Sequence, residues 1–219
     1  MIRGLREILP DNGKAFSSIL ISLKTRNFRL YFTGMCVSLT GTWMQQIAMS
    51  WLVYRLTGSV FLLATVTFMA QIPILLVTPL MSVFVDRFDR QKILILTQSL
   101  SMVQALSMAA LTLSGVIEVW HILILSLLIG CINALDNPTR QAFYPSLVAK
   151  EHLSNAIALN SAVINGSRLI GPAVGGVLIG IFGEGLCFLL NGISYLGVII
   201  ALFLMRLSPF TVKGYVNVD

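Results

Sequence analysis

Charged residues are scarce in this sequence. Asp, Glu, Lys and Arg make up 11% of its 219 residues, whereas about 25% is usual in a soluble domain. Hydrophobic residues make up 56%. A chain of this composition has too few polar side chains to cover a surface that faces water. The scarcity argues against a soluble enzyme, a disordered tail or a nucleic-acid-binding module, and it places the chain in a lipid bilayer.

Cysteine is also rare, and the common catalytic patterns are missing. The three cysteines, Cys36, Cys131 and Cys187, lie far apart in apolar stretches. They form neither a CxxC pair nor an even set, so we expect small packing residues, with no metal site and no disulfide framework. The sequence contains no HExxH, GxSxG or P-loop pattern. We therefore expect no enzyme activity and no cofactor.

The few charged residues divide the chain into uncharged runs of 17 to 30 residues. A membrane-spanning helix needs about 20 apolar residues, so the pattern predicts an all-α integral membrane protein with six transmembrane helices. The expected spans are 30–54, 60–84, 93–114, 119–137, 155–182 and 185–205. We expect a basic, amphipathic N-terminal segment at 1–29, a six-helix domain at 30–206 and a C-terminal tail at 207–219.

The basic residues predict the orientation. If the N-terminus is cytoplasmic, thirteen of the fifteen Lys and Arg residues fall on the cytoplasmic side, Arg55 falls on the opposite side and Arg168 is embedded. Cytoplasmic loops of membrane proteins carry such an excess of Lys and Arg. We therefore expect both termini in the cytoplasm. The net charge of +6 then reflects topology, and nucleic acid is not an expected partner.

A short charged loop follows the second span. Its basic residues are explained by a cytoplasmic position alone, but its two aspartates are not. Aspartate near the start of the third helix also favours the helix dipole. We interpret the segment as a gating loop that links helices on the cytoplasmic side. Its candidate residues are Asp86, Arg87, Asp89 and Arg90.

A second charged cluster ends the fourth span. The 17 uncharged residues before Asp136 correspond to about 26 Å of helix, which brings Asp136 to the cytoplasmic edge. Asp136 is then on the same side as Arg87 and Arg90, and an ion pair with one of these arginines would tie two helices together. The spacing predicts an inter-helix ion pair at this rim, for which we select Asp136 and Arg140. Separate, solvated charges are the alternative.

Polar residues interrupt the first and fifth spans. Such residues are costly in contact with lipid, so we expect them to face a cavity or protein. Arg168 lies deep in the fifth span, where we expect a role in a cavity or gate; a snorkelling structural arginine is the alternative. Single glutamines in spans often only bond neighbouring helices. The candidates for cavity lining are Trp43, Gln45, Gln46, Asn160 and Asn165.

Small residues recur at every fourth position of the fifth span. Ser167, Gly171 and Gly175 form one row, and Gly176 begins a second. Rows of this kind allow another backbone to approach closely in membranes. Pro172 lacks a backbone donor and permits a bend.

These segments together resemble the N-terminal half of a major facilitator superfamily (MFS) transporter. The resemblance is strongest to the bacterial exporters that include enterobactin exporters and transmembrane secretion effectors. It implies that Asp86 and Arg87 belong to the superfamily's loop motif, from which Asp89 departs. It also implies an antiporter-like motif in the fifth helix. That motif comprises Arg168, Gly171, Pro172, Gly175 and Gly176. The other segments that carry the resemblance are 41–45, 54–59 and 137–141.

The resemblance implies twelve helices in two halves with the substrate bound between them. A chain with six spans would then need a second six-helix half or a second copy of itself. The expected function is proton-coupled efflux of a siderophore, drug or metabolite across the bacterial cytoplasmic membrane by alternating access. The expected proton carrier is Asp136 or a residue of the other half. The alternative is a truncated or non-transporting membrane fragment or an assembly subunit, which the departure from the pattern after 210 favours.

Overall fold

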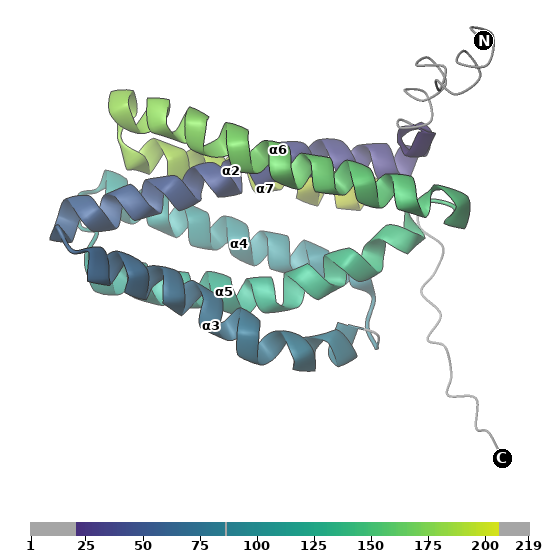
Figure 1. Ribbon diagram of the computed structural model, residues 1–219, viewed down its shortest axis with the longest axis horizontal. Helices are drawn as coiled ribbons and strands as arrows, with labels where there is room; N and C mark the ends of the chain where they lie inside the picture. Colours follow the sequence, from purple (N-terminus) through teal and green to yellow (C-terminus); the bar gives the residue numbers. More distant parts are fainter. Residues whose placement is uncertain (1–20, 86, 206–219) are drawn as a thin grey trace, which may run out of the picture.

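The computed structural model describes residues 21–85 and 87–205, and in these ranges it contains helices and no strand. Six long helices follow one another with short connections (Figure 1). They are α2 (Arg26–Thr57), α3 (Val60–Val85), α4 (Arg90–Leu113), α5 (Val119–Phe143), α6 (Leu153–Phe182) and α7 (Glu184–Leu204). Three short 3-10 helices accompany them: η1 (Ile21–Lys24), η2 (Tyr144–Ser146) and η3 (Lys150–His152).

The six helices lie where the uncharged runs of the sequence predict them. Five of them end within three residues of the predicted C-terminal limit, whereas α5 continues to Phe143 instead of ending at 137. At the N-terminal limits the largest difference is at α2, which begins at Arg26 instead of 30. Pro138 lies inside α5. The extra turn and a half contains Arg140, whose side chain is packed inside the bundle, so the polar residues expected to end the helix are part of it.

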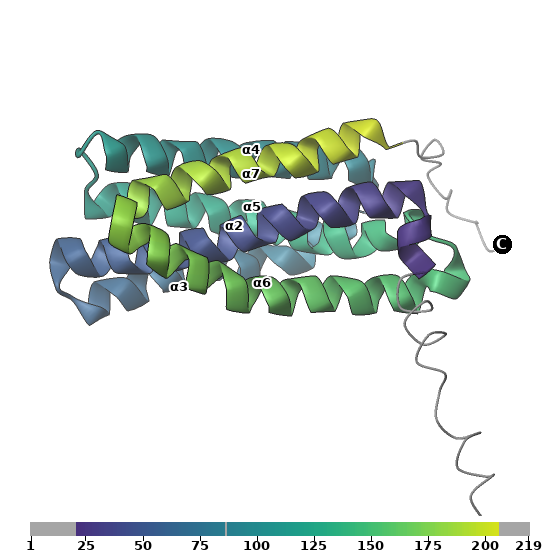
Figure 2. The same ribbon diagram turned by 90° about the horizontal axis from the view of Figure 1, so that it is seen from above.

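Local signals in the sequence end these helices. Gly58 adopts a left-handed conformation with a φ of 62°, and its N–H donates to the carbonyl oxygen of Tyr54, which closes α2. Asp89 caps the start of α4, because its Oδ1 accepts a hydrogen bond of 2.9 Å from the N–H of Gln91. The tight connections make neighbouring helices antiparallel. The start of α2 and the end of α7 therefore lie at the same end of the bundle (Figure 2).

The helices form two groups that are joined by α4. In Figure 1, α2, α6 and α7 lie together on one side, whereas α3 and α5 lie together on the other. The helix α4 packs against both α5 and α7. One apolar cluster, around Tyr31 and Phe143, fills the end of the bundle where α2 begins. A second cluster, around Leu52 and Phe188, fills the opposite end.

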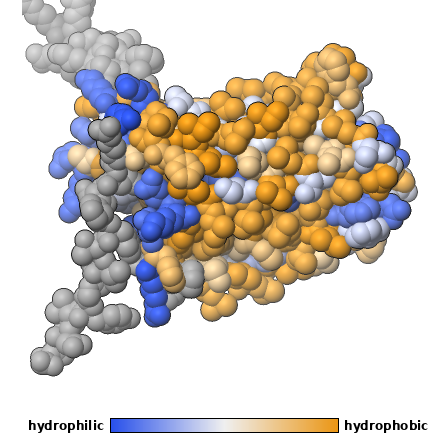
Figure 3. All heavy atoms as spheres, turned by 180° about the vertical axis from the view of Figure 1, so that it is seen from behind, coloured by the Kyte–Doolittle hydropathy of each residue, from blue (hydrophilic) through white to orange (hydrophobic). Residues whose placement is uncertain are grey.

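The surface of the bundle is that of a membrane protein. Figure 3 shows an apolar band along the helices, with hydrophilic residues gathered at the two ends. Within the described ranges, the five helices from α3 to α7 are long and apolar enough to cross a membrane. The 32-residue α2 is long enough but carries more polar residues. Of the five, α3 and α6 have the smallest buried shares.

Candidate functional site

A polar cavity of about 520 Å³ lies inside the half of the bundle where α5 ends and α6 begins. Its walls come mainly from α2, α5 and α6, with contributions from α4 and α7. Many of the lining residues carry amide or hydroxyl groups, although apolar atoms make up most of the wall surface. The polar wall residues are Ser38, Thr42, Trp43, Gln46, Gln98, Ser101, Asn133, Asn137, Arg140, Gln141, Tyr144, Asn160 and Tyr195.

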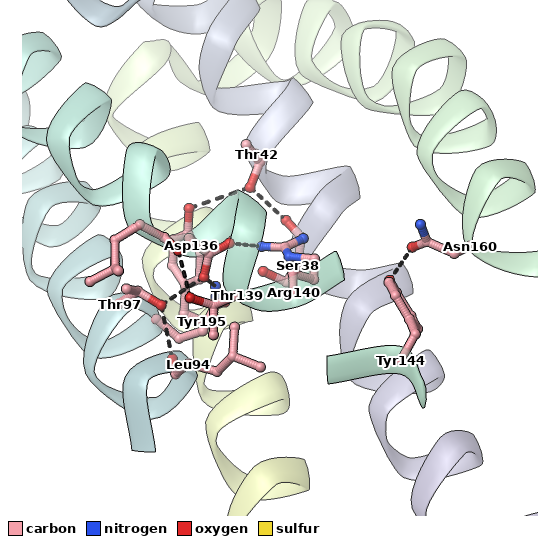
Figure 4. A network of polar contacts seen from close by, with 12 residues as sticks. Ser38, Thr42, Leu94, Thr97, Asp136, Thr139, Arg140, Tyr144, Asn160 and Tyr195 are labelled. Carbon is pink, nitrogen blue, oxygen red and sulfur yellow. Dashed lines mark hydrogen bonds and ion pairs between the residues drawn. The ribbon is translucent and has the colours of Figure 1, made fainter. Parts of the chain in front are cut away.

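Asp136 and Arg140 form an ion pair beside the cavity (Figure 4). Both residues lie on α5, one turn apart, so the pair itself joins no two helices. This corrects the prediction of an inter-helix ion pair at the rim. Asp136 is 2% exposed, and its Oδ1 accepts hydrogen bonds from Thr97 Oγ1 (2.7 Å) and Gln98 Nε2 (2.9 Å) of α4. The link between helices is therefore made by these neutral donors, which tie α5 to α4.

A hydrogen bond from the Tyr144 hydroxyl to Asn160 Oδ1 joins η2, which follows α5 directly, to α6. Figure 4 shows this pair apart from the Asp136–Arg140 pair. Both residues line the cavity. The bond therefore links two segments of the cavity wall, η2 and α6.

The row of small residues on α6 packs against α2. A Cβ atom on Gly171 would lie 2.6 Å from Trp43 Cβ and 2.9 Å from the Thr40 carbonyl oxygen. Ser167 is buried, and its hydroxyl lies 3.2 Å from Thr40 Oγ1. This confirms the close approach predicted from the spacing of Ser167, Gly171 and Gly175. At Gly176, by contrast, an added Cβ would meet nothing within 4 Å.

Arg168 lies midway along α6 and stacks on a cavity wall residue. Its guanidinium carbon is 4.8 Å from the centroid of the Trp43 ring, a cation–π contact between α6 and α2. Arg168 is exposed on the free side of α6, as is Asn165, whose side chain donates to the Ser161 carbonyl oxygen of its own helix. Asn165 is not among the residues that line the cavity.

The two adjacent glutamines of α2 have different environments. Gln46 lines the cavity, as do Trp43 and Asn160 among the predicted residues. Gln45 does not: it is 8% exposed, donates to Gln104 Oε1 at 3.1 Å and accepts from Asn191 Nδ2 at 2.8 Å. It therefore ties α2 to α4 and α7 in the interior. Adjacent residues of a helix point about 100° apart, so one of the two was bound to face away from the cavity.

The segment between α3 and α4 is described from Arg87 onward, and Asp86 lies outside the described residues. Arg87 is exposed to solvent. Asp89 serves as the cap of α4. Arg90 Nη1 donates to the carbonyl oxygen of Ala142 at 3.1 Å, which links the start of α4 to the last turn of α5. The segment thus contacts the end of the helix that carries the Asp136–Arg140 pair.

The sequence pattern missed an ion pair at the opposite end of the bundle. Arg55 donates two hydrogen bonds to Glu184, from Nε at 2.7 Å and from Nη2 at 3.2 Å. The pair joins the end of α2 to the start of α7. A signal was present, because Arg55 is the one basic residue that the topology assigns to that side. The cavity residues Tyr144 and Tyr195 were also missed, since a tyrosine in an apolar run gives no sign of which way it points.

Comparison with known proteins identifies a family and a set of transporters. A family model described as transmembrane secretion effector matches residues 17–211. The chain is 30% identical to the staphyloferrin A transporter of Staphylococcus aureus, over 76% of this chain and 42% of that protein. It is 27% identical to the uncharacterized MFS-type transporter YfiS of Bacillus subtilis, over 78% of this chain and 40% of that protein.

A third relative is the macrolide efflux protein A of Streptococcus pyogenes, which is 27% identical over 71% of this chain and 39% of that protein. The chain therefore spans about two fifths of the length of the curated relatives it matches. No solved structure matches the chain at a significant level.

Proposed function

Because this chain belongs to the transmembrane secretion effector family of the major facilitator superfamily, we propose that it forms one half of a small-molecule exporter that works by alternating access. The polar cavity between α2, α5 and α6 carries this proposal. Amide and hydroxyl groups inside a membrane bundle are costly unless the protein, water or a ligand satisfies them. In this proposal the cavity holds the transported molecule.

The second half of the transporter would cover α3 and α6. These helices have the smallest buried shares among the five apolar spans, and large apolar side chains such as Phe68, Leu75 and Leu169 are more than half exposed on them. At Gly176 and Gly180, also on α6, an added Cβ atom would meet nothing within 4 Å, so no neighbouring helix covers this part of its surface. The second half is either a separate six-helix protein or a second copy of this chain. In this proposal α2 also crosses the membrane and is the sixth span of the domain at 30–206.

We place the protein in the bacterial cytoplasmic membrane with both termini in the cytoplasm. The described basic residues support this orientation, since most lie at the end of the bundle where α2 begins. The cavity reaches that same end through Gln141 and Pro145. In this orientation the end of the bundle that the cavity reaches would face the cytoplasm, from which an exporter collects its substrate.

The loop before α4 and the fifth-helix motif would control the change of state. The Arg90–Ala142 hydrogen bond supports a link between the loop and α5. We assign gating roles to Arg87, Asp89 and Arg90, and we include Asp86 in the same loop. Arg168, Pro172 and Gly176 of α6 would belong to the face that moves against the second half, whereas Gly171 and Gly175 pack against α2. Protons would be the coupling ion.

Flux measurement in proteoliposomes tests the proposal. The purified chain is reconstituted alone and together with a six-helix half encoded beside it, and a trapped pH-sensitive dye reports substrate-dependent proton movement. We expect flux from the completed assembly and a clear loss of flux in its Arg168→Ala variant, with folding preserved. A strictly monomeric chain whose completed assembly shows no flux with any substrate would instead identify a non-transporting fragment or subunit.

A further inference from the structure

One positive charge lies midway along an apolar span and has no carboxylate beside it. Arg168 is roughly 20 Å from either end of α6, whereas the hydrocarbon core of a bilayer is about 30 Å thick. Its side chain is exposed and stacks on Trp43 of α2. Among the described residues, no carboxylate forms a salt bridge with Arg168. Charged side chains at this depth are costly and usually pair with one another.

The helices that form the surface around Arg168 contain no acidic residue. Neither Asp nor Glu occurs in α2, α3 or α6. The described carboxylates lie elsewhere: Asp136 is paired in the interior of the bundle, and Glu184 is paired at one end. The other described acidic residues lie at or next to helix starts and are Asp89, Glu118 and Glu151. This bundle therefore offers Arg168 no partner of its own.

A second copy of this chain would not supply the missing charge. In a symmetric dimer the same surface patch of both subunits meets across the interface. If the exposed faces of α3 and α6 met those of a copy, each Arg168 would lie against α2, α3 or α6 of that copy. In these helices α3 has no charged residue, α2 has arginines in its first and last turns only, and α6 has Arg168 alone. Two positive charges would then remain unbalanced in an apolar interface.

An apolar groove of about 440 Å³ continues the same surface towards the end of α6. Its walls come from α2, α3 and α6 and include Ile47, Trp51, Leu63, Gly176 and Gly180. Residues four apart lie on one side of a helix, so Trp43, which contacts Arg168, shares a side of α2 with Ile47 and Trp51. The arginine and the groove therefore lie along one seam between α2 and α6.

The floor of the groove has room for a large side chain. An added Cβ at Gly176 or Gly180 would meet nothing within 4 Å, and Trp51 is 50% exposed beside them. Gly176 and Gly180 follow Arg168 by about 12 and 18 Å along the helix axis. A neighbouring helix that ran along α6 could therefore contact both the arginine and the groove.

We infer that this docking face, which comprises Arg168 and the groove, binds a six-helix half of different sequence. That half presents a carboxylate to Arg168 and a large apolar side chain to the groove. The inference rests on the proposed function, and it decides between the two partners that the proposed function allows. Stacking on Trp43 holds the guanidinium group at the seam, where its N–H groups can donate to a carboxylate in pairs.

Photo-cross-linking in the cells that naturally produce the protein identifies the occupant of the docking face. A benzophenone side chain replaces Leu169, which is 77% exposed beside Arg168, or Val177, which is 62% exposed beside the groove. The control position is Val103 of α4, which is 56% exposed outside the docking face. We expect cross-links from the first two positions, and none from the third, to an apolar span of different sequence that contains Asp or Glu.

Exchange of charges then tests the contact itself. Arg168→Glu should lower the recovery of the co-purified partner at least tenfold, because two carboxylates would face each other. Replacing the partner's carboxylate by arginine in the same assembly should restore the recovery. Gly180→Leu fills the groove and should lower the recovery at least fivefold. The matched control is Lys92→Glu, the same change of charge at an exposed residue of α4, which should leave the recovery unchanged. Circular dichroism confirms that each variant is folded.

Three results would overturn the inference. The first is a cross-link from position 169 or 177 to this chain itself, or to no protein. The second is a cross-linked span without an acidic residue. The third is a recovery that Arg168→Glu leaves unchanged or that the exchanged charge does not restore. The proposed function is judged separately by flux: a self-associated chain that transports would refute only the inference, and a charge-paired assembly without flux would refute only the function.

Discussion

At the scale of single residues, the charges inside this bundle are held by specific neighbours. Asp136 accepts hydrogen bonds from Thr97 and Gln98 and forms an ion pair with Arg140. Removing one member of a buried ion pair leaves an uncompensated charge, and this usually costs more than removing both members. We therefore expect a loss of stability when a buried, hydrogen-bonded residue is replaced and little loss when a residue that only faces the cavity is replaced.

The first prediction concerns the Asp136 carboxylate. Asp136→Ala should lower the free energy of unfolding by about 3–5 kcal/mol, because Arg140 then remains buried without its partner. The double variant Asp136→Asn with Arg140→Gln should lose less than half as much. Unfolding in mixed micelles, followed by circular dichroism, measures both values. An Asp136→Ala variant as stable as the parent would show that the pair does not stabilise the fold.

The adjacent glutamines of α2 give the second prediction. Gln45→Leu breaks the hydrogen bonds to Gln104 and Asn191 and should cost about 1–2 kcal/mol of unfolding free energy. Gln46→Leu, one residue further on, removes a cavity side chain and should leave stability within about 0.5 kcal/mol. The same unfolding measurement compares the two. If both variants lost the same unfolding free energy, the hydrogen bonds of Gln45 to Gln104 and Asn191 would contribute nothing specific to stability.

At the scale of helices, the close packing of α6 against α2 depends on the small residues Gly171 and Gly175. The added atom of an alanine at 171 would be 2.6 Å from Trp43 Cβ, and at 175 it would be 2.8 Å from Ile47 Cγ2. At 180 it would meet nothing within 4 Å. One face of α6 is thus fitted to α2, and another is left open along the same helix.

The third prediction follows from this contrast. Gly171→Ala should cost about 1–3 kcal/mol, because the backbones of α6 and α2 must separate to admit a methyl group. Gly180→Ala should be neutral or slightly stabilising, since alanine is favoured over glycine in a helix by roughly 0.5–1 kcal/mol. Thermal unfolding of the two variants in the same detergent provides the measurement. A stable Gly171→Ala protein would contradict the close packing of the two helices.

Helix positions were largely predictable from the sequence, but the faces of the helices were not. The limits of α3 and α6 follow from uncharged runs and from nearby charges, which are local features. The spacing of Ser167, Gly171 and Gly175 also indicated a contact face. Nothing in the spacing showed that the partner would be α2, because that depends on how the whole bundle packs.

At the scale of the whole molecule, the two ends of the bundle differ in charge. Arg26, Arg29, Arg90, Lys92 and Lys150 lie at the end where α2 begins. The opposite end holds the Arg55–Glu184 ion pair, in which the positive charge is balanced. By the positive-inside rule, the first end is the one we expect to face the cytoplasm.

The fourth prediction tests this orientation. A reporter that is active only in the cytoplasm should be active when fused after Asp219 and inactive when inserted between Gly115 and Val116, in the connection from α4 to α5. A reporter active only outside the cytoplasm should give the opposite result. Membrane-impermeant labelling of single cysteines at the two sites serves as the control. Activity of the first reporter at both sites would contradict the assigned topology.

The sequence alone determined the class of protein, the approximate limits of the long helices and the orientation expected in the membrane. These properties follow from composition, run length and charge, which are read residue by residue. The tertiary structure decided which side chains meet. It placed Gln46 on the cavity and Gln45 in the interior, and it paired Asp136 with the next turn of its own helix. The reason is geometric: a helix turns about 100° per residue, so the packing of the bundle sets the environment of each side chain.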